Sequence, residues 1–176
     1  MPEAREAAGR EIREGVGRLE EWMGVDAGAL ASARWLLRGD SIWLHSADAW
    51  PLGAWGPDEL DDPAAGWRFT SLGLRAFRRE SGGRLRPTHD LLMRLDAQVQ
   101  GRVITLGAAD ARRLLEDGGL AVQGVPDGYA ALRLEGHVVG RGFVRSGRVR
   151  PEIPRPQRRS LLEALAASEG GSAAAG

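Results

Sequence analysis

The 176 residues include 24 acidic and 24 basic side chains, every basic one an arginine, and no cysteine, so the net charge is zero. The absence of cysteine excludes disulfides, thiolate zinc sites and a cysteine nucleophile, and no apolar run reaches the ~20 residues of a membrane-spanning helix. We therefore expect a soluble, cytoplasmic protein with no membrane partner, folded as one domain or as two small packed modules.

Residues 1–40 are predicted to form a helical segment. Apolar side chains recur at spacings of three and four through residues 3–23, which predicts an amphipathic helix. Its apolar face holds Ala8, Ile12, Val16, Leu19, Trp22 and Met23. Glycines inside the helix weaken it by ~1 kcal/mol each relative to alanine, so we expect it to need a packing partner. A second short helix is expected over Ala27–Leu37, ending at Gly39.

Residues 41–104 are predicted to form a small α/β linking module. Its expected strands and helix are Ser41–Ser46, Leu74–Glu80, Arg84–Arg86 and His89–Ala97. Thr88 is the expected N-cap of that helix, whose core face would be Leu91, Leu92 and Leu95. A loop rich in proline, glycine and aspartate covers Ala47–Gly66, and the tryptophans in or beside it are interpreted as packing residues or as stacking residues for bases.

Residues 105–160 are predicted to form a third domain. A strand over Arg102–Gly107 leads into it, followed by a helix over Ala109–Asp117 and a strand over Leu120–Val125. Residues 161–176 are expected to hold the end of a last helix, Arg158–Ser168, and a disordered tail, Gly170–Gly176.

The segment Gly128–Pro154 carries the main functional signal. Glu135-Gly136 and Ser146-Gly147 are tight-turn signals that separate three short strands. Alternation puts Ala130, Leu132, Leu134 and Val149 in a core and Arg133, Arg148 and Arg150 outside. Gly140 and Gly142 mark a bulge, a barrel corner or a close backbone approach by a ligand.

Arginine is concentrated in the second part of the chain. Residues 1–66 contain 6 arginines and 13 acids, a net charge of −7, whereas residues 67–160 contain 18 arginines and 9 acids, a net charge of +9. The planar guanidinium fork suits phosphate oxygens. We expect one edge to carry Arg141, Arg145, Arg148 and Arg150, and the RNA-binding candidates are Arg75, Arg78, Arg84, Arg141, Arg145, Arg148, Arg150 and Arg155. The alternative is an ordinary hairpin with solvated arginines.

Catalytic patterns are missing from the sequence. The histidines, His45, His89 and His137, have no metal-ligand spacing, and neither a GxSxG elbow nor a P-loop is present. We predict no metal, no cofactor and no catalysis by this chain alone.

Two segments resemble a known family. The run GYAALRLEGHVVGRGFVRSGRVRPEIPRPQRR resembles the C-terminal PUA-like domain of Nop/Sun-type RNA cytosine-5 methyltransferases, in the bacterial branch that modifies small-subunit rRNA. Upstream, LGLRAFRRESGGRLRPTHDLLMRL resembles the module that joins the catalytic domain to that PUA-like domain. The resemblance covers roughly Ser41–Arg159 and implies a small mixed α/β module and a C-terminal PUA-like β-barrel. With the short N-terminal helices predicted above, the expected fold class is α+β.

The resemblance also implies RNA binding, with rRNA as the expected partner. The family's catalytic part is an S-adenosylmethionine domain with paired cysteines, and this chain has no cysteine. The alternative prediction is a protein-interaction subunit or a fragment of a split methyltransferase, in which the acidic first third docks on a separate catalytic chain.

Overall fold

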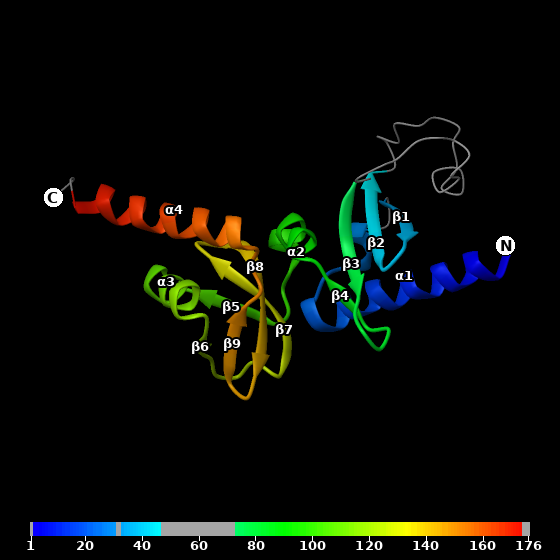
Figure 1. The fold of residues 1–176 in the computed structure, drawn as a ribbon, viewed down its shortest axis with the longest axis horizontal. Helices are drawn as coiled ribbons and strands as arrows, with labels where there is room; N and C mark the ends of the chain where they lie inside the picture. The colour runs from blue at the N-terminus through cyan, green and yellow to red at the C-terminus, as the bar shows by residue number, and fades with distance from the viewer. Residues whose placement is uncertain (1, 31–32, 47–72, 174–176) are drawn as a thin grey trace. The chain divides into compact units, whose positions relative to one another are not determined.

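The computed structural model describes residues 2–30, 33–46 and 73–173 (Figure 1). These residues form four α-helices and two β-sheets, which confirms the α+β class. The chain divides into two compact units, each built from two segments: unit 1 is Met1–Glu20 with Asp26–Leu91, and unit 2 is Glu21–Val25 with Leu92–Gly176. Within the described ranges no helix combines the length and apolar character that crossing a membrane requires.

Unit 1 is built on a four-stranded antiparallel sheet in the order β1-β2-β3-β4. Its strands are β1 (Ala33–Arg38), β2 (Ser41–Ser46), β3 (Leu74–Arg79) and β4 (Leu85–Pro87). The predicted first helix is confirmed as α1 (Pro2–Met23). It packs against this sheet at Gly15, where a Cβ atom would come within 3.0 Å of the Phe77 ring and 3.3 Å of the Leu85 side chain. The packing partner expected for the helix is therefore the chain's own sheet.

The predicted helix over Ala27–Leu37 is wrong. Among the described residues of that range only Ala27–Leu30 is helical, as one turn of 3-10 helix, and Ala33–Arg38 is strand β1. The physical reason is the cross-strand pairing that follows from the Gly39–Asp40 turn, which places Arg38 opposite Ser41 and lets β1 pair with β2 along its whole length. Trp35 gains a stacked contact with Phe77, with 6.1 Å between the ring centroids. The predicted boundary between residues 40 and 41 thus falls inside a hairpin.

The predictions that follow β2 agree with the structure where it is described. Strands β3 and β4 are where they were expected, and the predicted helix is α2 (His89–Leu95), continued by a 3-10 turn, Asp96–Gln98. Thr88 caps α2, because its Oγ1 accepts a hydrogen bond from the Leu91 backbone N–H at 3.2 Å. Leu91, Leu92 and Leu95 are buried as expected. The predicted loop Ala47–Gly66 and its tryptophans lie outside the described residues.

Unit 2 contains a five-stranded mixed sheet in the order β5-β7-β8-β9-β6 that curls into a half-barrel (Figure 1). Its strands are β5 (Val103–Leu106), β6 (Leu120–Ala121), β7 (Gly128–Leu134), β8 (His137–Arg145) and β9 (Arg148–Pro151). Only β5 and β7 pair in parallel, and α3 (Ala108–Asp117) follows β5. Gly118 ends α3 in the left-handed conformation, with φ 71°.

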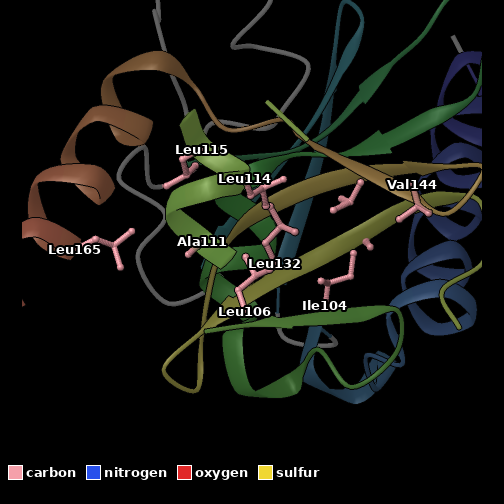
Figure 2. Close-up of a cluster of buried hydrophobic side chains, with 10 residues drawn as sticks. Ile104, Leu106, Ala111, Leu114, Leu115, Leu132, Val144 and Leu165 are labelled. Atoms are coloured by element: carbon pink, nitrogen blue, oxygen red, sulfur yellow. The ribbon is translucent and has the colours of Figure 1, made fainter. Parts of the chain in front are cut away.

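The core of unit 2 lies between the sheet and two helices. Figure 2 shows Ala111, Leu114 and Leu115 of α3 beside Leu106 and Leu132 of the sheet. Leu165 of α4 (Arg155–Ala173) belongs to the same cluster. Full burial of a leucine side chain is worth about 1.5–3 kcal/mol, so this cluster fixes which face of the sheet points inward.

The segment Glu21–Val25 joins unit 2 through backbone hydrogen bonds. The carbonyl of Met23 accepts from the N–H groups of Gln100 at 2.9 Å and Gly101 at 2.7 Å. Gly24 and Gly101 approach so closely that a Cβ on either would lie 2.9 Å from the other's backbone nitrogen. A short piece of α1 and its exit therefore completes a unit whose other residues begin at Leu92.

Both turns predicted in Gly128–Pro154 are confirmed. Glu135 and Gly136 have φ of 51° and 87°, and Ser146 and Gly147 have φ of 51° and 71°, as two-residue type I′ hairpins require. Two expected elements differ in length. The strand over Leu120–Val125 is only β6, and α4 continues through Ala173, where a disordered tail was predicted from Gly170. Residues 174–176 are outside the described range.

Candidate nucleic-acid interface

The curled sheet of unit 2 has an inner face in the core and an outer face that carries arginine and aromatic side chains. Cross-strand register defines the outer face, because directly opposite residues point to the same side. Phe143 of β8 lies opposite Tyr129 on β7 and opposite Arg150 on β9. Arg145 lies opposite Arg148 across the Ser146–Gly147 turn. We call Tyr129, Phe143, Arg145, Arg148 and Arg150 the hairpin face.

Three arginines of the hairpin face are exposed, as the sequence predicts for Arg145, Arg148 and Arg150. Val149 between them is fully buried and holds β9 against the core. Arg148 also donates from Nη2 to the Gly119 carbonyl at 3.3 Å, which fixes the direction of its side chain. Like charges directly opposite on a sheet repel, so this arrangement favours an anion placed between them.

An aromatic pair lies beside these arginines. The Tyr129 and Phe143 rings meet edge to face, with centroids 5.1 Å apart and an angle of 73° between their planes. Both side chains are half-buried, so part of each ring surface reaches solvent. Aromatic rings next to guanidinium groups are the combination on which nucleobases stack while phosphates are neutralised.

Arg141 does not join the exposed arginines, which corrects the expectation of one edge made of Arg141, Arg145, Arg148 and Arg150. Arg141 is only 6% exposed. Its Nη2 lies 2.6 Å from Oε2 of Glu152, and its guanidinium carbon lies 5.1 Å from the centroid of the Tyr129 ring. The Glu152 N–H also donates to the Arg141 carbonyl at 2.8 Å. Arg141 therefore links the segment after β9 to β8 and contacts the Tyr129 ring.

Arg133 also differs from the expectation that it points into solvent. It is half-buried, and its Nη2 donates to the Val99 carbonyl at 2.6 Å. The alternation fails here because Ala130, Ala131 and Leu132 are all fully buried, so β7 is covered on both faces.

The two glycines of β8 have structural explanations. The register shifts between Leu132 and Arg133, and Gly140 lies opposite Leu132 at that shift, so the predicted bulge is confirmed. A Cβ atom on Gly142 would lie 2.5 Å from Cγ2 of Val149. The space at Gly142 is thus occupied by the core, which accounts for this glycine without a ligand.

The remaining predicted arginines lie elsewhere. Arg155 is exposed at the start of α4. Arg75, Arg78 and Arg84 belong to unit 1 and are exposed on β3 or just before β4. Arg78 pairs with Asp40, with 3.1 Å between Nε and Oδ2. The predicted set is therefore divided between the two units, with Arg75, Arg78 and Arg84 in unit 1 and the others in unit 2.

One polar cluster has no counterpart in the sequence predictions. Asp96, at φ 37°, accepts the Val138 N–H on Oδ1 at 2.7 Å and lies 2.9 Å from Nδ1 of His137 through Oδ2. The hydrogen bond with His137, followed by that from Val138, lowers the pKa of Asp96. This cluster fastens the start of β8. Its only sequence signal is an aspartate after a helix end, which is too common to single out.

The described residues contain no group of three or more histidine and acidic side chains placed to hold a metal ion. Neither a scan against models of protein families nor a search of curated proteins finds a match to this chain.

Proposed function

We propose that this chain is a non-catalytic RNA-binding protein that contacts structured RNA through the hairpin face. The observation that carries the proposal is the set of three exposed arginines on adjacent positions of β8 and β9, next to the half-buried Tyr129–Phe143 pair. The arginines would pair with phosphates and the rings would contact an unstacked base.

The finer fold proposal is that unit 2 is a PUA-like domain. Its support is the curled five-stranded sheet with α3 between β5 and β6, together with the resemblance of Gly128–Pro154 to the PUA-like domain of rRNA cytosine-5 methyltransferases. That resemblance makes rRNA the proposed RNA class. The catalytic step would belong to another chain or be absent.

The test compares two charge-matched double variants of the full chain. R145E/R150E alters the hairpin face, and R94E/R113E reverses two exposed arginines on α2 and α3. Binding of a fluorescein-labelled rRNA hairpin is measured by anisotropy over a range of salt concentrations. We expect R145E/R150E to weaken binding about tenfold or more and to reduce the salt slope by about 0.7–0.9 per lost phosphate contact. Equal weakening by R94E/R113E would show that only net charge matters and would overturn the assignment.

The second candidate is docking on a separate methyltransferase chain. The charge of −7 on residues 1–66 favours it, because an acidic segment suits a basic protein surface better than RNA. The apolar face of α1 does not add to this case, since Leu19 and Met23 are already buried. Purification from native lysate with and without ribonuclease separates the two candidates. A stoichiometric protein that survives ribonuclease supports docking, and loss of all partners supports RNA binding.

A further inference from the structure

The sheet of unit 1 also has two different faces. One face holds Phe77 and Ile42, which are fully buried, and Gly15 of α1 packs against Phe77. The register places other residues on the opposite face: Trp43 lies opposite Leu36 on β1 and opposite Arg75 on β3, and Arg34 lies opposite His45. We call Arg34, Leu36, Trp43, His45, Arg75 and Arg78 the Trp43 face.

The Trp43 face is strongly basic. The four strands of this sheet contain six arginines and no acidic residue. Arg34, Arg75 and Arg78 are exposed. Among the described residues, Asp40 pairs with Arg78, Glu80 lies 3.6 Å from Arg86, and Glu11 of α1 pairs with Arg79. Charge complementarity therefore indicates a polyanion as the partner for this face.

Trp43 lies at the centre of these cations. Its side chain is half-buried, and the guanidinium carbon of Arg75 lies 4.9 Å from the centroid of its ring. This contact orients both groups before any ligand arrives. By contrast, Trp35, the neighbouring tryptophan on β1, is stacked on Phe77 and belongs to the core side. Trp43 therefore lies on the basic face of the sheet, outside the set of buried core residues.

We propose that the Trp43 face is a second RNA-contacting surface, one that takes a single-stranded segment by stacking a base on Trp43 and neutralising the flanking phosphates with Arg34, Arg75 and Arg78. The chemistry favours a single strand because a base in a duplex has no free face to offer the indole. The inference rests on the proposed RNA-binding function and adds to it a surface in a different unit.

The experiment uses the full chain and two probes: a labelled oligouridine of about 12 nucleotides and the labelled rRNA hairpin. W43L removes the aromatic ring and keeps an apolar side chain, whereas W43F keeps an aromatic ring. Stacking on an aromatic side chain contributes enough that W43L should weaken oligouridine binding roughly 5- to 100-fold, with W43F within about threefold of the parent. R94E/R113E, which reverses two charges outside both faces, should leave oligouridine binding within about twofold. Unfolding by urea shows whether W43L remains folded.

A second readout locates the base directly. With 5-fluorotryptophan incorporated, the ¹⁹F resonance that W43F removes is assigned to Trp43, and oligouridine should shift that resonance. The inference would be overturned if the parent and W43L bound oligouridine with equal affinity. It would also be overturned if oligouridine bound to the parent without shifting the Trp43 resonance.

The two proposals fail separately. If the parent protein binds the rRNA hairpin but not oligouridine, the proposal for the Trp43 face is overturned and the proposal for the hairpin face is kept. If the parent protein binds oligouridine through Trp43 but does not bind the rRNA hairpin, the proposal for the hairpin face is overturned and the proposal for the Trp43 face is kept. If the parent protein binds neither probe, both proposals are overturned.

Discussion

Arg145 and Arg148 face each other across a two-residue turn, so that two positive side chains occupy directly opposite positions on adjacent strands. A sheet gains nothing from this pair, since like charges at opposite positions destabilise it by about 0.2–1 kcal/mol. The hydrogen bond from Arg148 to Gly119 fixes one partner without removing the repulsion. A bound phosphate would turn the repulsion into a two-sided contact.

Stability and binding should therefore respond in opposite directions to a charge reversal at Arg145. R145E places a carboxylate opposite Arg148, and we expect the free energy of unfolding to rise by about 0.2–1 kcal/mol. RNA affinity should fall in the same variant, because a phosphate contact is replaced by repulsion. Urea unfolding and anisotropy measure the two quantities. R150E is the control, since the residue directly opposite position 150 is Phe143 and not an arginine. A loss of stability in R145E would contradict this account.

Arg141 should matter for folding more than for binding. R141M removes the Arg141–Glu152 ion pair, and the Glu152 side chain is only 31% exposed. The partial exposure reduces the cost below that of a fully buried pair, so we expect a loss of about 1–3 kcal/mol. At temperatures where R141M is folded, its affinity for RNA should stay within about threefold of the parent. The double variant R141M/E152M should recover part of the stability, which a thermodynamic cycle would measure.

Gly142 should be sensitive to the size of residue 149. G142A adds a methyl group 2.5 Å from Cγ2 of Val149, and overpacking of this kind costs about 1–3 kcal/mol. V149A removes the nearest obstructing atom, although the Arg150 carbonyl oxygen and Cδ2 of Leu132 stay 3.2 Å from the added methyl group, and it leaves a cavity of its own. We expect G142A/V149A to be more stable than the sum of the single changes predicts, by about 1 kcal/mol. Strictly additive effects, together with lost RNA binding in G142A, would instead favour the close approach of a ligand to this glycine.

Asp96 should make stability depend on acid pH. Its pKa lies below the ordinary value of 3.8 in the folded protein, chiefly through His137, so folding favours the carboxylate. Its contribution is complete above the ordinary pKa and disappears as the pH falls through the lowered value. D96N keeps a side chain that tolerates φ 37° and can still accept the Val138 N–H. We expect D96N to be less stable than the parent near neutral pH and the difference to shrink in acid, as followed by urea unfolding at a series of pH values. A difference that grows in acid would refute the assignment.

The sequence predicted most of the elements whose signals are local. Thr88 marks the start of α2, Gly118 marks the end of α3, and the two glycine turns define the hairpins that join β7, β8 and β9. Strand β1 was missed because Ala33–Arg38 has no strong strand signal of its own and gains its conformation from pairing with β2. Tertiary pairing overrode local propensity there.

The candidate site was predictable only in part for the same reason. Alternation correctly directs Arg148 and Arg150 outward on either side of Val149. It fails for Arg141, because the outward face of a central strand can be covered by residues distant in sequence, here Glu152 and Tyr129. Likewise, the pairing of Trp43 with Arg75 joins positions more than 30 residues apart, and periodicity within one segment contains no information about it.

The segment Glu21–Val25 belongs to unit 2, although residues of unit 1 precede and follow it in the sequence. It is held to Gln100 and Gly101 by backbone hydrogen bonds. No single peptide bond can be cut so that each product retains a complete unit. A truncation starting at Leu92 would release a half-barrel missing the backbone acceptor of Met23, and one ending at Leu91 would carry that segment without its partner. Unit 2 therefore cannot be separated from unit 1, in the laboratory or by exchange of domains during evolution, without breaking the chain at more than one place.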